Sequence, residues 1–107
     1  MRFETTEAFD ADYKRLKPEH QRAFRAVAKD KFAAACDSWA EAILGGQIYV
    51  WPKSLRVDAL TGAAGIWEMT WSFASPDGRA TFQLVRVDGE WYCRWRRVGD
   101  HGVYRSP

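Results

Sequence analysis

The chain has 107 residues, of which 47% are hydrophobic and 28% charged, and its formal net charge is +2. This length predicts a single domain over residues 1–107 with room for one core. Residues 51–107 hold eight basic and six acidic side chains and supply the whole positive excess. So small an excess excludes a strongly basic nucleic-acid binder, so any contact with RNA should be local.

The sequence also lacks the patterns of several other protein classes. No apolar run approaches the ~18 residues of a membrane span, and the start of the chain lacks the apolar segment of a signal peptide. We therefore expect a cytoplasmic protein without membrane contact. Cys36 and Cys93 form no CxxC pair. They predict two buried free thiols, although a disulfide between them stays open. No residues have metal-ligand spacing and no glycine-rich phosphate loop occurs, so we expect no metal and no cofactor.

The first half of the sequence predicts a short strand followed by two helices. Thr5 or Thr6 is placed to cap the first helix. Pro18 ends that helix and begins a second one, which is predicted from Pro18 to Leu44. Two helices joined at a proline form a helical hairpin. The apolar stripe of the first helix is Phe9, Tyr13 and Leu16.

The second half changes to the alternating pattern of strands. Residues 55–60 are a short strand or an extended link, and strands are predicted over 66–74, 79–87 and 90–98. The fold class is therefore α+β, with the N-terminal strand and helical hairpin packed on a twisted antiparallel sheet. The side chains expected to be buried together under the helices are Trp67, Trp71, Phe82 and Trp95.

The opposite face of this sheet is predicted to be polar and to carry arginines. Side chains two residues apart share a face, which places Arg79, Arg94 and Arg96 together on neighbouring strands. An arginine binds a phosphate through two parallel hydrogen bonds, so this face is a candidate phosphate site. The alternative is a solvated face whose arginines pair with nearby carboxylates.

Two further charged residues each have two alternative environments in this pattern. Glu68 lies on the predicted polar face, where it is a general base or pairs with an arginine across the sheet. Arg97 follows Arg96 and falls on the apolar side of its strand. Its position predicts a bend at the strand end or a buried ion pair.

The last residues contain a candidate proton-transfer group. A turn between Gly99 and Gly102 presents His101, and Tyr104 follows. Histidine has the side-chain pKa closest to neutral pH, and an exposed tyrosine ring can stack on an unpaired base. The alternatives are a turn histidine bonded to backbone and a tyrosine that closes the core. Phosphate binding, proton transfer and stacking are what a small metal-free ribonuclease needs.

The order of these segments resembles the RelE/ParE superfamily of toxins from bacterial toxin–antitoxin pairs. The resemblance covers nearly the whole chain and rests on three segments: Phe3, Thr6 and Phe9 near the start, residues 55–68, and residues 98–104. The ending is most similar to the branch that includes YafQ, where a Gly-x-His precedes an aromatic residue.

The resemblance implies a RelE-like fold and a toxin that cuts mRNA without metal in the ribosomal decoding site. By position, His101 matches the acid–base residue and Tyr104 the aromatic that follows it, while Arg79 and Arg96 match the basic residues facing the phosphate. Arg94, Arg97 and Glu68 would bind substrate. The implied partners are a cognate antitoxin, mRNA and the ribosome, with DNA contacted only through an antitoxin complex.

Two other functions remain open from the sequence. A ParE-like protein would poison DNA gyrase by protein contact and would not cut RNA. A catalytically inert homologue would bind its antitoxin and do nothing further. The Gly99-x-His101 ending followed by Tyr104 favours the ribonuclease, and the small net charge favours the gyrase inhibitor.

Overall fold

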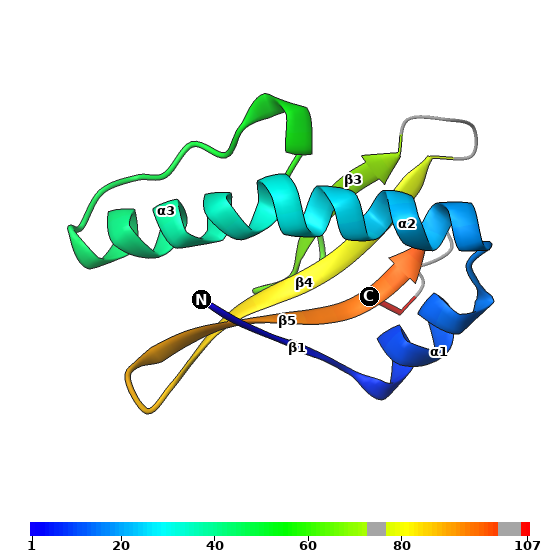
Figure 1. The fold of residues 1–107 in the computed structure, drawn as a ribbon. Coiled ribbons are helices and arrows are strands. Elements are labelled where there is room, and N and C mark those ends of the chain that lie inside the picture. Colours follow the sequence, from blue (N-terminus) through cyan, green and yellow to red (C-terminus); the bar gives the residue numbers. More distant parts are fainter. Residues whose placement is uncertain (73–76, 101–105) are drawn as a thin grey trace.

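A long helix lies across one face of a five-stranded sheet in the computed structural model of the protein, which describes residues 1–72, 77–100 and 106–107 (Figure 1). The strands are β1 (Arg2–Thr5), β2 (Asp58–Ala59), β3 (Trp67–Ser72), β4 (Gly78–Val87) and β5 (Glu90–Gly99). The helical segments are α1 (Glu7–Arg15), α2 (Pro18–Val27), the π-helical turn η1 (Ala28–Phe32), α3 (Ala33–Leu44) and the short 3-10 turn η2 (Lys53–Leu55).

The sheet confirms the predicted α+β class and differs from it in one detail. The strand order is β1-β5-β4-β3-β2, and the β2–β3, β3–β4 and β4–β5 pairs are antiparallel as expected. However, β1 pairs with β5 in parallel, with Arg2 opposite Tyr92, so the sheet is mixed. A parallel pair needs a long crossover connection, which the helices and the other strands together provide.

The helical hairpin forms where the sequence places it. Thr6 is the N-cap of α1, and its hydroxyl accepts a hydrogen bond from the Phe9 amide at 3.1 Å. Pro18 stands in the first turn of α2, where its missing N–H leaves no bond unmade. The helix predicted from Pro18 to Leu44 is continuous, but its turn Ala28–Phe32 is π-helical. Residues 55–60, predicted as a short strand or an extended link, hold the end of η2 and the two-residue strand β2.

Aromatic rings fill the space between the long helix and the sheet. Phe32 is fully buried, and its ring centroid lies 4.7 Å from that of Trp95 and 4.9 Å from that of Phe82. Trp71 is buried in the same cluster, and Trp67 packs against its border. The predicted burial of these aromatic side chains under the helices is therefore confirmed.

The two cysteines are free and buried in this core, as the sequence predicts. Cys36 belongs to α3 and Cys93 to β5. Burial raises the pKa of the Cys93 thiol, and the neighbouring Cys36 thiol raises it further. Because the thiolate is the reactive form, Cys93 is a structural side chain.

A β-bulge in β5 decides where the arginines point. Thr81 of β4 lies opposite Arg97, but the next residue, Phe82, lies opposite Trp95, so Arg96 is the extra residue. The bulge shifts the alternation by one position, which returns Val98 to the core and removes Arg97 from it. The irregular strand end predicted at Arg97 is therefore confirmed.

Arg97 also forms the predicted ion pair, with Asp12 of α1. Its Nε lies 2.6 Å from Asp12 Oδ2 and its second terminal nitrogen 3.0 Å from Oδ1, which is a bidentate contact. Asp12 Oδ2 also accepts a hydrogen bond from the Val98 amide at 3.2 Å, and its side chain is 8% exposed. The hydrogen bond to Asp12 raises the pKa of Arg97, so the guanidinium stays charged throughout the working pH range.

None of the helices in the described ranges has the length and apolar character needed to cross a membrane.

We expect Asp12→Ala to lower the free energy of unfolding by about 2–4 kcal/mol, because it leaves the Arg97 guanidinium and the Val98 amide without their acceptor. Arg15→Ala is the matched control. Arg15 also lies near Asp12, at 3.7 Å, but its side chain is 77% exposed. Its loss should cost less than about 1 kcal/mol. Urea denaturation of both variants measures the difference, and equal losses would contradict the structural role of Asp12.

Candidate functional site

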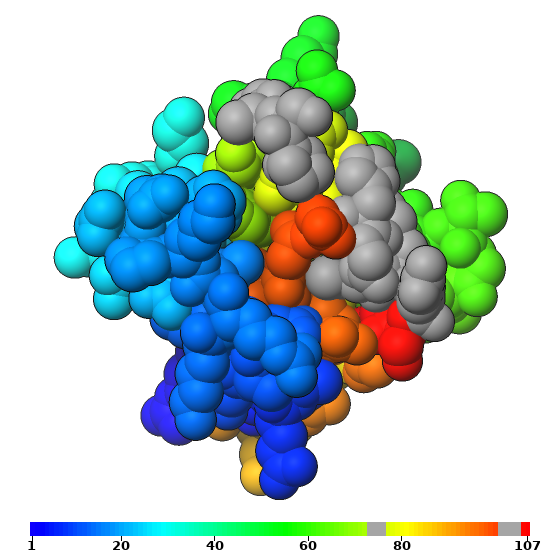
Figure 2. Space-filling view, turned by 90° about the vertical axis from the view of Figure 1, so that its right-hand side faces the viewer, coloured from blue at the N-terminus to red at the C-terminus, as the bar shows by residue number. Residues whose placement is uncertain are grey.

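The polar face of the sheet, opposite the long helix, carries a group of arginines. Arg79 is the second residue of β4, and β5 contributes Arg94, Arg96 and the displaced Arg97. Figure 2 shows the end of the molecule where these strands meet, with α1 and α2 in blue, the end of β5 in orange and the last residues in red. Because β4 and β5 pair as a hairpin, side chains that are far apart in the sequence share one surface.

Arg79 is held beside two carboxylates without using all its donors. A terminal nitrogen donates to Asp77 Oδ2 at 3.1 Å, and another lies 4.0 Å from Glu68 Oε1. The side chain is 18% exposed, yet its Nε is buried and has no hydrogen-bond partner among the residues that the structure describes. Leaving a buried donor unpaired costs folding free energy. The Nε of Arg79 is such a donor at this face.

Thr70 supplies a second unused polar group at the same place. It is the cross-strand partner of Arg79, and its side chain is 2% exposed. Its Oγ1 has no hydrogen-bond partner within residues 1–72, 77–100 and 106–107. In the part of the chain that the structure describes, Thr70 Oγ1 and Arg79 Nε are the two buried side-chain polar atoms left unpaired. We call these two groups the unpaired donor pair.

Arg94 and Arg96 are tied to neighbouring strands. The Arg94 Nε donates to Glu4 Oε1 of β1 at 2.7 Å, and this pair is partly exposed. Arg96 donates from a terminal nitrogen to Gln83 Oε1 of β4 at 2.8 Å. These contacts fix both guanidinium groups on the polar face.

Residues Ser106 and Pro107 lie over this face and accept hydrogen bonds from it. The Pro107 backbone oxygen accepts from Arg96 Nε at 2.8 Å and from the Thr81 hydroxyl at 3.1 Å. The Ser106 backbone oxygen accepts from Arg97 at 3.1 Å. The donors on this surface therefore bind oxygen acceptors already, which is the chemistry that a phosphate oxygen requires.

The strand position of Arg79 depends on a contact between Trp71 and Gly78. The Trp71 indole lies over the start of β4, and its Nε1 donates to the Arg79 backbone oxygen at 2.9 Å. A Cβ atom at Gly78 would lie 2.5 Å from the Trp71 ring, so the absence of a side chain there makes this contact possible. Packing of Trp71 on the core side of the sheet therefore fixes the backbone position of Arg79, whose side chain lies on the other side.

The structure brings most of the predicted site residues to one surface. Arg79, Arg94, Arg96 and Glu68 share the polar face, and Glu68 pairs loosely with an arginine, one of its two predicted alternatives. Arg97 stands at the edge of this surface with its guanidinium on Asp12. His101 and Tyr104 lie outside the described residues. The catalytic and substrate-binding roles given to all seven residues remain predictions.

Two residues that the structure makes prominent have no predicted role from the sequence. Thr70 follows Glu68 by two residues and so shares its strand face, but nothing in the sequence shows that its hydroxyl is unpaired. Asp12 did leave a signal, because it lies three residues after Phe9 and four before Leu16, on the apolar stripe of α1. An acidic residue on a buried helical stripe indicates a buried ion pair.

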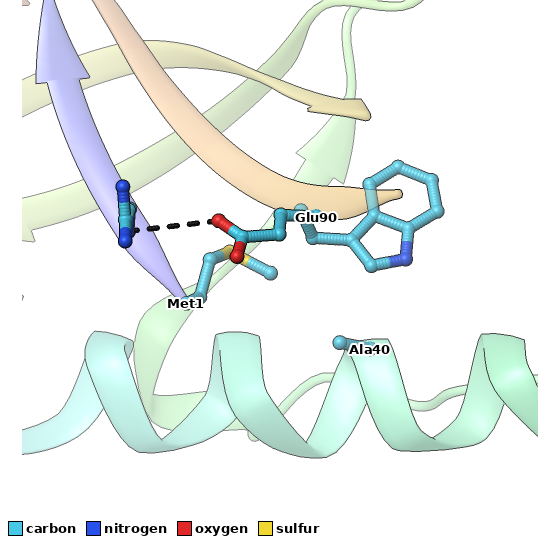
Figure 3. A pocket seen from close by; sticks show the side chains of 5 residues that line it. Met1, Ala40 and Glu90 are labelled. Atoms are coloured by element: carbon cyan, nitrogen blue, oxygen red, sulfur yellow. Dashed lines mark ion pairs between the residues drawn. The ribbon is translucent and has the colours of Figure 1, made fainter. Parts of the chain in front are cut away.

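A separate hollow lies at the other end of β1. It has a volume of about 400 Å3 and is formed between the start of β1, α3 and the start of β5 (Figure 3). An ion pair between Arg2 and Glu90, 3.6 Å long, crosses its mouth. The hollow is lined by Met1, Arg2, Ala40, Glu90 and Trp91, and we assign it no function.

Comparison with solved structures identifies the fold. The YoeB/ParE toxin from Agrobacterium tumefaciens superposes with a TM-score of 0.55 and 15% identity, over 94% of this chain and 99% of that one. The intact RelBE toxin–antitoxin complex of E. coli gives 0.50 and 12%, over 92% and 94%. The DinJ–YafQ complex of E. coli gives 0.48 and 16%, over 96% and 97%. No protein-family model matches the sequence, and no curated protein matches it.

The chain therefore has the fold of the RelE/ParE toxins over nearly its whole length. The resemblance stated from the sequence is confirmed at the level of this fold. The more specific assignment to the YafQ branch remains a prediction.

We expect Gly78→Ala to destabilise the protein by about 1–3 kcal/mol, because the new methyl group would overlap the buried Trp71 ring. Gly45→Ala is the control, since a Cβ atom there would meet its nearest neighbour at 3.6 Å, an ordinary contact distance. Thermal melts give the stabilities, and tryptophan fluorescence reports the displaced indole. A Gly78→Ala protein with unchanged melting and fluorescence would show that this contact does not hold the strand.

Proposed function

We propose that this protein is the toxin of a toxin–antitoxin pair and a metal-independent endoribonuclease that cuts mRNA on the ribosome. The observation that carries the proposal is the unpaired donor pair, Arg79 Nε and Thr70 Oγ1, within a surface of arginines. Groups of this kind are retained where a ligand satisfies them. The RelE/ParE-like fold supports the same assignment, and the RelBE structure contains a toxin with its antitoxin.

The reaction uses the ribose 2′-hydroxyl as the nucleophile on the adjacent phosphorus atom. A base removes the hydroxyl proton as the new O–P bond forms, and an acid protonates the 5′-oxygen as its bond to phosphorus breaks. The products are a 2′,3′-cyclic phosphate and a 5′-hydroxyl. His101 carries one of these protons, and Tyr104 or Glu68 is the candidate for the other.

The arginines stabilise the charge that develops on the phosphate oxygens. Arg79 and Thr70 donate to one oxygen, and Arg96 donates to another from the neighbouring strand. Arg94 binds the backbone beyond the cut. Arg97 holds the end of β5 through Asp12, and a substrate oxygen replaces the Ser106 backbone oxygen on its remaining terminal nitrogen. In the sequence, His101 follows Gly99 by two residues, and Gly99 is the strand partner of Arg79.

The cognate antitoxin would neutralise the toxin by covering the arginine surface or a free sheet edge. β1 is an edge strand, and all four of its residues are exposed. An exposed edge can accept an added strand from a partner. Complex formation should therefore be insensitive to the loss of a single site residue, because binding is spread over many contacts.

We expect Thr70→Val to reduce RNA cutting by at least tenfold while leaving stability unchanged or raised. The substitution removes an unpaired buried hydroxyl, which contributes nothing to the fold, and retains the shape of the side chain. Thr81→Val is the matched control, because its hydroxyl is equally buried but bonded to Pro107. Thr81→Val should lose stability. If Thr70→Val cuts RNA at the wild-type rate, the unpaired donor pair is not part of the active site.

We expect His101→Ala to abolish toxicity and RNA cutting, with a change in stability under about 1 kcal/mol and normal antitoxin binding. Induced expression followed by mapping of mRNA 5′ ends tests cutting, and thermal melts test the fold. A gyrase supercoiling assay runs beside them. A His101→Ala protein that cuts normally rejects the catalytic assignment. A wild-type protein that cuts no RNA but blocks gyrase replaces the proposed function with the ParE-like alternative.

A further inference from the structure

A cavity adjoins the unpaired donor pair at the end of the polar face nearest β2. Its volume is about 580 Å3, which is within the range of small-ligand sites. One wall is the segment between β2 and β3, and the opposite side is bounded by Pro107. The cavity is lined by Ala59, Leu60, Thr61, Gly62, Ala63, Glu68 and Pro107.

Glu68 is the charged side chain in this lining. Its carboxylate lies 4.0 Å from the nearest Arg79 nitrogen, beyond hydrogen-bond distance, and its side chain is only 18% exposed. Within the described part of the chain, this carboxylate accepts no hydrogen bond and has no closer ion pair. Its oxygens therefore have free acceptor capacity inside a partly enclosed space, where a hydrogen bond discriminates strongly between ligands.

The spacing between the cavity and the donor pair matches neighbouring parts of one nucleotide. Glu68 and Thr70 are two residues apart on the same face of β3, which places them about 6.8 Å apart along the strand. If a phosphate oxygen lies between Thr70 and Arg79, the sugar and base attached to it extend over this distance. The direction toward Glu68 leads into the cavity.

The chemistry of Glu68 selects among the four bases. A carboxylate only accepts hydrogen bonds. Guanine presents two adjacent donors, N1–H and N2–H, on its Watson–Crick edge. Adenine and cytosine present an amino group beside an acceptor nitrogen, and uracil presents one N–H between two carbonyl groups. Only guanine can donate to both carboxylate oxygens without placing an acceptor against them.

We infer that the cavity beside Glu68 binds the guanine base of the nucleotide next to the cut phosphate. This inference rests on the proposed function, since it names the base that the same site reads. It assigns Glu68 to base recognition, which leaves Tyr104 as the candidate for the second proton transfer. The small apolar side chains of Ala59, Leu60 and Ala63 contact the faces of the base, and Glu68 accepts from its edge. The protein is accordingly selective for guanine at one fixed position beside the cut.

The test compares wild type with Glu68→Gln, which keeps the size of the side chain. A glutamine amide has an NH2 donor group beside a carbonyl acceptor, and it pairs with adenine. Mapped 5′ ends from wild type should show guanine at one position beside the cut. In Glu68→Gln, cutting at these sites should fall by about ten- to hundredfold, and adenine should replace guanine as the preferred base. Glu90→Gln is the control, because it removes the same charge from a distant, exposed ion pair.

A binding measurement separates this inference from the proposed function. Guanosine 3′-monophosphate should shift the backbone amide NMR signals of residues 59–63 in wild type but not in Glu68→Gln. The adenosine, cytidine and uridine 3′-monophosphates should do so much more weakly. Equal shifts by all four nucleotides, or a guanine preference unchanged in Glu68→Gln, would overturn the inference. If wild type cuts no RNA, the proposed function fails, and the nucleotide titration alone decides whether the cavity binds guanine.

Discussion

The bidentate contact between Asp12 and Arg97 is the interaction on which the rest of this structure depends. β1 ends at Thr5, so the edge of β5 beyond Trp95 has no neighbouring strand. α1 covers that edge instead: Asp12 accepts from the Val98 amide, and the Thr6 hydroxyl donates to the Arg96 backbone oxygen at 2.8 Å. One short helix thus satisfies the backbone where the sheet ends.

The same contact stabilises the bulge that builds the polar face. Without the extra residue Arg96, strand alternation would direct Arg97 into an aromatic core and Val98 out of it. The bulge reverses both, and the buried carboxylate of Asp12 binds the displaced guanidinium. Two consecutive arginines then lie outside the core at the strand end, next to the backbone oxygens of Ser106 and Pro107. Fold stability and the charge of the candidate site therefore have a common origin.

The two faces of the sheet are also coupled at Arg79. Its backbone oxygen accepts from Trp71 in the core, whereas its side chain lies on the polar face beside Thr70 and Glu68. Core packing there is tight enough that Gly78 admits no side chain. An active site needs donors held in place before the substrate arrives, and donors on strands of a packed sheet meet that need.

The sequence by itself determined the fold class, the helical hairpin, the three long strands and, up to the bulge at Arg96, the face on which each strand residue lies. These features follow from periodicity and from Pro18, both of which act over a few residues. It also placed Arg79, Arg94 and Arg96 on one surface, because alternation fixes the face within each strand. At Arg97 it left two alternatives, since a break in alternation shows that something is irregular without naming the partner.

Only the tertiary structure decided which residues, distant in the sequence, lie next to each other. The parallel pairing of β1, the 85-residue separation between Asp12 and Arg97, and the unpaired hydroxyl of Thr70 depend on register and on contacts between distant segments. The cavity at Glu68 likewise forms from a strand, the connecting segment before it and Pro107. Local sequence patterns carry no information about such pairings, because the free energy that selects them comes from burial and hydrogen bonding across the whole fold.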